Sequence, residues 1–222
     1  MKTNFKFLLI VLLQLIMING CEKNTNQVAI AQTDVLMPLA VGNTWIYKHT
    51  LLDSNNQVEF DGYDTLKVLK DSIINGNTFF GCSNGRFYRN TSWGLEMYYS
   101  FYNTNIIQHL QFPTAVNNSW VNFSADYPDS TSGNNDSLRV KYTTHNIDTL
   151  INVPKGNFNC IRYKQSLDGK NGTPFTMFYE AILEPVDAYY TKNIGVVKIV
   201  YMIQPNNYRQ KFIFELVDYT LF

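Results

Sequence analysis

The sequence predicts an all-β protein, a single domain of antiparallel strands in meander order behind a secretory leader. After Met37, apolar and polar residues alternate with a period of two, which is typical of half-buried strands. Clusters of Asn, Gly, Asp and Pro interrupt this alternation at short intervals, and no long stretch keeps a helical period. Aromatic residues reach 15% of the 222 residues, a composition that suits strands. Hairpins are therefore expected in place of strand–helix–strand units.

The N-terminus has the three parts of a secretory signal. Lys2 and Lys6 form the charged start, an apolar run extends from Phe7 to Ile18, and the small residue Gly20 precedes Cys21. The apolar run is shorter than the roughly 20 residues that span the bilayer core, so a permanent membrane helix is disfavoured. We expect residues 1–20 to be removed as a signal peptide.

The four residues from Ile18 to Cys21 resemble the lipobox of bacterial lipoproteins, although Asn19 stands where Ala or Ser is usual. The resemblance implies that Cys21 becomes the first residue of the mature chain and carries lipid. Its acyl chains would exceed the two signals that stable membrane anchoring needs. The alternative is an ordinary secreted protein in which Cys21 is a free or disulfide-paired thiol.

Residues 21–36 predict a lipidated cysteine followed by a flexible tether, because the stretch is polar, mostly uncharged and without strong periodicity. A flexible tether of this length reaches about 20 Å on average. The β domain, residues 37–222, should therefore lie close to lipid headgroups in the bacterial cell envelope. The outer membrane is the expected site, and its periplasmic and external faces both stay open.

The first strands follow two turn signals. Gly42 and Asn43 supply a turn, and the next strand places alternate residues on one face, namely Trp45, Tyr47, His49 and Leu51. Asn75-Gly76 lies between two apolar runs and is the pair that best tolerates the positive φ angles of a type I′ hairpin. A tight hairpin is therefore predicted there.

Later strands show the same alternation. One apolar face is predicted over residues 137–145 and another near the C-terminus, carried by Leu138, Val140 and Tyr142, and by Phe212, Phe214 and Leu216. Residues 97–102, MYYSFY, are aromatic on both faces of any strand they form. They predict either a strand covered on both sides or a curved sheet whose ring-lined concave face holds a ligand.

Three stretches, residues 38–47, 153–164 and 189–201, resemble a group of cell-envelope lipoproteins of Bacteroidota with GNxWxY, VPxGxF and GVVK strand motifs. The resemblance implies a single curved antiparallel sheet that forms a half-barrel or incomplete barrel, similar to lipoprotein-carrier or lipocalin-like folds. The group has no settled activity, so the resemblance implies no catalytic residues.

The search for an active site predicts no catalytic residue, metal ligand or cofactor. The three histidines, His49, His109 and His145, lack the spacing of a zinc site, and the nucleophile-elbow and nucleotide-loop motifs are absent. Glu180, Glu184 and Asp187 are close in sequence, but Pro185 and strand-like surroundings argue against an acid/base pair. The formal net charge of zero gives no attraction to nucleic acid.

Two further cysteines, Cys82 and Cys160, leave two alternatives open. In an oxidising envelope a disulfide between them would close a long loop and stabilise the fold by about 4 kcal/mol. Two buried free thiols are the other interpretation, because a bridge requires Cα atoms within about 7 Å.

These observations predict a lipid-anchored, non-catalytic binding or structural module. Its expected partners are the membrane, through the lipid anchor, and a hydrophobic molecule or a glycan held in an aromatic-lined concavity. The alternatives are an interaction subunit of an envelope complex, with the aromatic surface as interface, and a hydrolase with a dispersed site.

Overall fold

The computed structural model describes residues 34–98, 106–128, 135–169, 184–203 and 210–222. The chain divides into two units, Met1–Thr33 and Asp34–Phe222. The predicted signal peptide, Cys21 and most of the predicted tether lie outside the described residues. Across the described ranges, no helix is long and apolar enough to cross a membrane.

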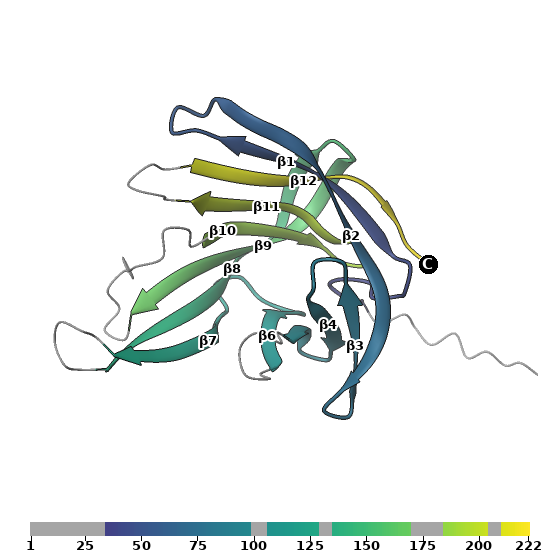
Figure 1. Ribbon diagram of the computed structural model, residues 1–222, viewed down its shortest axis with the longest axis vertical. Coiled ribbons are helices and arrows are strands. Elements are labelled where there is room, and N and C mark those ends of the chain that lie inside the picture. Colours follow the sequence, from purple (N-terminus) through teal and green to yellow (C-terminus); the bar gives the residue numbers. More distant parts are fainter. Residues whose placement is uncertain (1–33, 99–105, 129–134, 170–183, 204–209) are drawn as a thin grey trace, which may run out of the picture. The chain divides into compact units, whose positions relative to one another are not determined.

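The unit Asp34–Phe222 is all-β, as the sequence predicts (Figure 1). Its twelve strands form one antiparallel sheet in the order β6-β5-β4-β3-β2-β1-β12-β11-β10-β9-β8-β7. The strands are β1 (Thr44–Leu52), β2 (Val58–Ile74), β3 (Asn77–Cys82), β4 (Phe87–Thr91), β5 (Gly94–Tyr98), β6 (Ile106–Gln111), β7 (Ser119–Pro128), β8 (Asn135–Val153), β9 (Gly156–Gly169), β10 (Glu184–Thr191), β11 (Gly195–Ile203) and β12 (Gln210–Thr220).

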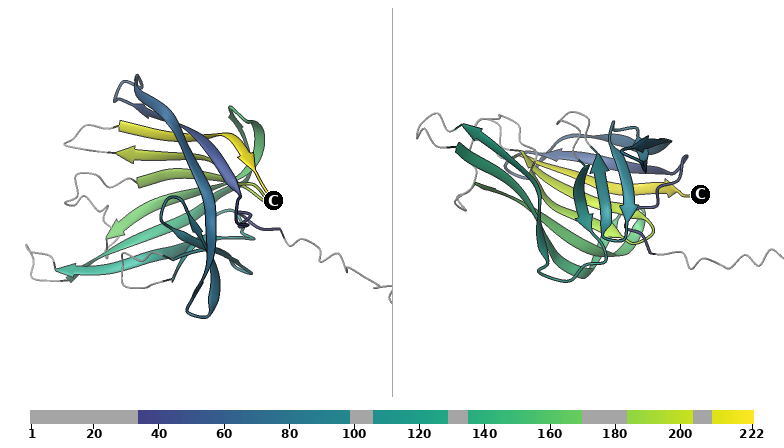
Figure 2. Two further views of the ribbon diagram at one scale, coloured as in Figure 1. Left: turned by 45° about the vertical axis from the view of Figure 1, so that its right-hand side comes forward. Right: turned by 90° about the horizontal axis from the view of Figure 1, so that it is seen from below.

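The sheet is curved and is not closed into a barrel (Figure 2). The two strands at its ends, β6 and β7, follow each other in the chain and lie in contact, but they are not neighbours in the hydrogen-bonded order. The predicted curved, incomplete meander is therefore confirmed. The chain runs strand by strand along the sheet from β1 to β6 and again from β7 to β12, and the antiparallel β1–β12 pair joins these two runs.

Strand β2 divides the sheet into two parts. Its first portion pairs with β1 and its second portion pairs with β3. We call the strands β7–β12, β1 and the start of β2 the large half, and the end of β2 with β3–β6 the small half. Figure 1 shows β2 arching from the one to the other. Sequence alternation alone predicts the strands but not this division, because both parts share the same period.

The predicted hairpin at Asn75-Gly76 is confirmed. Asn75 has φ 50° and Gly76 has φ 75°, and the two residues connect β2 to β3. Both angles are positive, as a type I′ turn requires.

One hydrophobic core lies between the two halves. The large half contributes Trp45, Tyr163, Val197 and Leu216, and the small half contributes Val68, Leu95 and Leu110, all of which are fully buried and belong to one cluster. The face of the large half that turns toward this core is called the inner face below. Along β1 it carries Trp45 and Tyr47, so the strand alternation predicted from Trp45 to Leu51 points inward.

The folded unit begins three residues before the boundary predicted at residue 37. Leu36 is buried in the core, and the Val35 amide donates a hydrogen bond to Asn193 Oδ1 at 3.0 Å. Met37 is buried as well, and its carbonyl accepts a hydrogen bond of 2.7 Å from Asn90 Nδ2. Val35, Leu36 and Met37 form a short apolar run with no strand period, so only the tertiary contacts assign this segment to the core.

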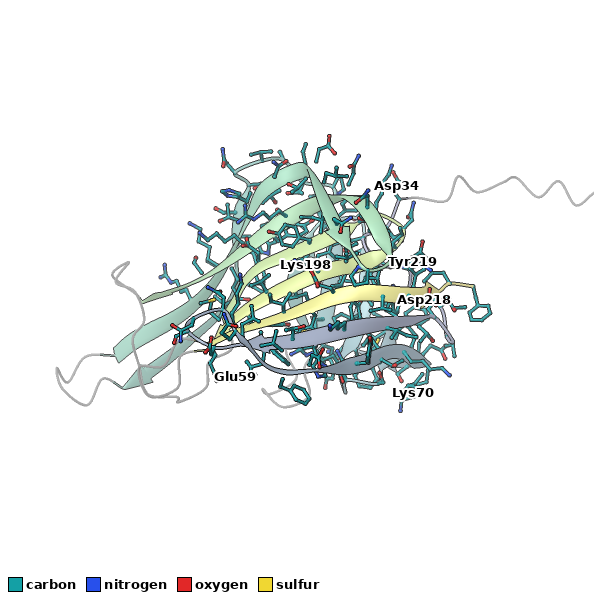
Figure 3. The ribbon with its side chains drawn as sticks, turned by 90° about the horizontal axis from the view of Figure 1, so that it is seen from above. Asp34, Glu59, Lys70, Lys198, Asp218 and Tyr219 are labelled. Atoms are coloured by element: carbon teal, nitrogen blue, oxygen red, sulfur yellow. The ribbon has the colours of Figure 1, made fainter. Side chains whose placement is uncertain are left out.

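The outer face of the large half carries ion pairs between neighbouring strands. Lys198 Nζ lies 2.6 Å from Glu215 Oε1, joining β11 to β12. Lys155 pairs with Asp218, and both lie at the surface near Tyr219; Figure 3 labels Lys198, Asp218 and Tyr219. Lys155–Asp218 is an exposed pair, and exposed pairs contribute little stability, typically 0 to about 1 kcal/mol each. The alternation of charged and apolar residues thus follows the two faces of the sheet.

Candidate binding face

Aromatic side chains gather on the inner face where β2, β1, β12 and β11 lie side by side. His49 on β1 is paired with Phe214 on β12 and with Gly62 on β2, and Leu51 is paired with Phe212 and with Phe60. Because paired residues project to the same side of a sheet, these side chains share one face. The inner face is therefore ring-lined along neighbouring strands that come from both ends of the domain sequence.

The rings surround the imidazole of His49. Its centroid lies 5.2 Å from that of Phe60, with the two planes at 21°, and 5.5 and 5.9 Å from those of Phe212 and Phe214. Phe212 and Phe214 are 4.8 Å apart, and Tyr201 meets Phe214 at 5.8 Å, edge to face. Such offset and edge-to-face pairs are favourable geometries for aromatic contacts. These five residues are called the aromatic cluster.

The polar atoms of His49 are placed by β2. Nδ1 lies 2.9 Å from Asp64 Oδ2, while Nε2 is buried and has no hydrogen-bond partner among the described residues. A Cβ added to Gly62 would lie 2.6 Å from Nε2, so the imidazole occupies the space that any other residue at position 62 would fill. The Asp64 contact and Gly62 together define the position of the ring within the aromatic cluster.

A layer of tyrosines lies deeper on the same face. Tyr47, Tyr142 and Tyr190 are buried, and Tyr47 donates a hydrogen bond of 3.1 Å to the Val196 carbonyl. Burial raises the pKa of each of these phenols well above its ordinary value, and neighbouring phenols raise it further. They stay protonated at neutral pH.

The positive charge of Arg86, in the turn between β3 and β4 of the small half, affects the pKa of two of the tyrosines on the inner face. Burial raises the pKa of Tyr142 and Tyr201, and the positive charge of Arg86, just before β4, opposes that rise in both. The inner face thus combines rings, buried phenols and the Asp64 carboxylate, and the charge of Arg86 acts on the phenols. Aromatic rings stack on apolar surfaces, and a carboxylate accepts hydrogen bonds. The arrangement therefore favours a ligand that has both an apolar surface and hydrogen-bond donors.

A separate shallow depression lies near the tip of the β1–β2 hairpin. It has a volume of about 260 Å³, and its lining includes Asp53, Ser54, Asn56, Met202 and Lys211. It is open to solvent, and its lining residues within the described ranges are polar or charged apart from Met202 and include no ring. Its chemistry therefore differs from that of the aromatic cluster.

Among the residues that the sequence raised as acids or metal ligands, those whose side chains the structure describes, His49, His145 and Asp187, lie on three different strands. Asp187 lies on β10 and accepts two hydrogen bonds from Arg162, at 2.7 and 2.9 Å. Both oxygens of its carboxylate therefore take part in an ion pair with Arg162. His49 lies in the aromatic cluster, whereas His145 is exposed on β8. Glu180 lies outside the described residues, as do the side chains of His109 and Glu184. Within the part of the chain that the structure describes, no group of three or more His, Cys, Asp and Glu side chains is placed to hold a metal ion.

Both later cysteines are buried free thiols. Cys82 on β3 has its sulfur 4.0 Å from the Phe80 carbonyl, and Cys160 on β9 lies 3.3 Å from Thr191 Oγ1. Of the two alternatives left open by the sequence, the structure has the free thiols. Cys21 lies outside the described residues.

The sequence pointed to part of this face. It placed His49 on the same side as Trp45 and Tyr47, and it put Phe212 and Phe214 on one face of the last strand. It did not single out Phe60 and Asp64 on β2. Their signal is the two-residue spacing of Phe60, Gly62 and Asp64, and it is weak because neighbouring Tyr63 and Glu59 alternate on the other face with similar chemistry.

No protein-family model and no curated protein sequence matches the chain. Two solved structures are similar to it over 84% of this chain and 99% of their own. One is a protein inferred to be a lipoprotein, from Parabacteroides distasonis, with a TM-score of 0.45 and 13% identity. The other is a protein inferred to be exported, with a YmcC-like fold, from Bacteroides fragilis, with a TM-score of 0.43 and 10% identity.

Proposed function

We propose that this chain is a lipid-anchored cell-envelope protein that binds a small ligand on the inner face of its large half, without catalysing a reaction. The aromatic cluster is the observation that carries the proposal. Phe60 is 55% exposed although its ring stacks on His49, so an apolar surface stays open to solvent inside the curve of the sheet. Ligand sites are commonly concave, ring-lined surfaces with a few polar groups.

The physical argument concerns the free energy of an exposed ring. Burying apolar surface is worth roughly 25 cal/mol per Å². Phe60 is 55% exposed, so a ligand that covers its side chain would gain free energy by removing this apolar surface from water. Asp64, whose side chain is 59% exposed, adds a polar group that can fix the orientation of a ligand.

A second candidate function is that of an interaction subunit, and exposed apolar residues on the small half and its turns favour it. Ile73 is 71% exposed and Trp93 is 75% exposed. Trp93 is followed directly by β5, and Ile73 lies near the end of β2. Exposed large side chains of this kind are enriched where a protein partner docks.

The anchoring part of the proposal is tested with Cys21→Ser in the native host. The wild-type protein is expected in the membrane fraction with a lipidated Cys21, and the variant is expected without lipid. A soluble wild-type protein whose mass shows an unmodified Cys21 would contradict the anchor. It would leave the binding face untouched, because the anchor and the face are separate parts of the chain.

The binding part is tested by native mass spectrometry of protein isolated from that host. A small molecule should co-purify with the wild-type protein and be lost from Phe60→Ala. Ile73→Ser with Trp93→Ser is the matched variant on the other candidate surface, and it should retain the molecule. A co-purifying protein that is lost only from the second variant would favour the interaction subunit. A wild-type protein that carries neither would contradict both functions.

A further inference from the structure

Phe60 offers a flat platform with one open side. One face of its ring is stacked on His49, at 5.2 Å and 21°, and the exposed 55% of the residue leaves the opposite face available. His49 in turn is held by Phe212 and Phe214 from β12. The platform is thus supported from behind by packed rings and does not depend on a ligand for its orientation.

A carboxylate lies beside this platform. Asp64 is two residues beyond Gly62 on the same face of β2, and its Oδ2 is bonded to His49 Nδ1 at 2.9 Å. Its side chain is 59% exposed, and within the described chain its other oxygen, Oδ1, makes no hydrogen bond. The imidazole therefore links an open ring surface and an exposed acceptor.

We infer that the ligand of this face is a saccharide, with the C–H face of a pyranose ring on Phe60 and hydroxyl groups donating to Asp64. This inference rests on the proposed binding function and names its substrate class. A pyranose carries an apolar face and several O–H donors on one rigid ring, which matches a stacking platform beside an acceptor. Hydrogen bonds to an ionised carboxylate are also stronger than those between neutral groups.

Two other ligand classes fit the same atoms less well. A hydrocarbon chain would cover the platform but would desolvate Asp64 without giving it a donor, which is unfavourable. A quaternary ammonium group is usually held inside a cage of rings. Here the space between Phe60, Phe212 and Phe214 is already filled by His49.

The test is calorimetric titration of the full-length mature protein with a panel of soluble oligosaccharides at millimolar concentration. The panel contains hexose, N-acetylhexosamine and uronate oligomers, and laurate and tetramethylammonium serve as probes of the other two classes. At least one oligosaccharide should bind. Phe60→Ala and Asp64→Asn should each weaken its binding about tenfold or more, the effect of removing a central contact.

Matched controls come from the opposite face of the same strand. Tyr63 is 68% exposed, and Asp61 pairs with Lys48 at 3.1 Å. Tyr63→Ala and Asp61→Asn remove a ring and a charge of the same kinds and should leave saccharide binding unchanged. All four altered residues are largely exposed, so thermal unfolding should show that each variant stays folded.

The outcomes separate this inference from the proposed function. If laurate or tetramethylammonium binds in a Phe60-dependent way and no oligosaccharide does, the saccharide inference is wrong and the binding function stands. If an oligosaccharide binds equally well to the wild-type protein and to Phe60→Ala, the inferred place is wrong. If no probe of any class binds, both the inference and the binding function are contradicted.

Discussion

The hydroxyl of Tyr163 donates a hydrogen bond of 2.7 Å to the backbone carbonyl of Gln111. Tyr163 lies on β9 in the large half and Gln111 ends β6 in the small half, and the two residues are 52 positions apart. The ring of Tyr163 is fully buried and packs edge to face on Trp120 and Tyr190. One phenol thus joins the end strand of the small half to the middle of the large half.

Tyr163→Phe should lower the free energy of unfolding by about 1 kcal/mol, because it removes this hydrogen bond and leaves the ring contacts in place. Urea unfolding measures the effect, and the m value should not change. Tyr63→Phe removes a hydroxyl from a residue that is 68% exposed, and it should change little. Equal effects of the two variants would show that the Tyr163 bond does not stabilise the fold.

Gly94→Ala should destabilise the protein more than Gly76→Ala. Gly94 has φ 130°, and a Cβ there would lie 2.1 Å from the Leu110 carbonyl oxygen and 2.5 Å from the Phe112 nitrogen. Gly76 has φ 75° and open space around it, so its replacement costs about 1 to 2 kcal/mol for the left-handed conformation alone. Overpacking should add about 1 to 3 kcal/mol at Gly94. Thermal or urea unfolding of the two variants compares them, and a smaller loss at Gly94 would contradict the close packing of β5 on β6.

Cys82 and Cys160 should resist alkylation in the folded protein. Burial raises the pKa of Cys82 to about 11, and burial also raises that of Cys160, with the Thr191 hydroxyl opposing the rise. Because the thiolate is the reactive form, iodoacetamide at pH 8 should modify neither residue until urea is added. Intact mass after native and denaturing treatment counts the modified thiols. Rapid native labelling, or a mass that shows an oxidised pair, would contradict this arrangement.

Stability should fall as the pH rises above about 10. The buried phenols of Tyr47, Tyr142 and Tyr163 have folded-state pKa values raised by burial, whereas in the unfolded chain they titrate near pH 10. The folded state then holds more protons than the unfolded state above that pH. The stabilisation is complete below pH 10 and is lost as the pH rises toward the folded-state values.

Urea unfolding at a series of alkaline pH values, with tyrosine absorbance followed in parallel, measures this loss. The absorbance should rise in two steps, first from exposed phenols and then, together with unfolding, from the buried ones. All 15 tyrosines of the chain ionising together near pH 10 with the fold intact would contradict the buried layer.

Much of the fold could be predicted from local sequence. The alternation of Trp45 and Tyr47 with polar neighbours, and the Asn75-Gly76 pair, each specify their structure through side-chain period and backbone angles. The binding face could be predicted only in part. The strand alternation predicts that His49 and Phe212 face inward. Phe60 and Asp64 join this face only because β2 pairs with β1 in the observed register.

The sequence by itself determined the class of fold, the positions of turns and strands, and the expectation of a lipid-anchored envelope protein, because period, turn residues and leader grammar are local. The tertiary structure decided that β2 bends into a second half, that Leu36 belongs to the core, and that Cys82 and Cys160 are buried free thiols. It also decided that rings from β1, β2, β11 and β12 form one cluster. These features depend on which strands pair and in which register. The register is set by burial of the whole inner face, to which many distant residues contribute, so it cannot be predicted from any single stretch of the sequence.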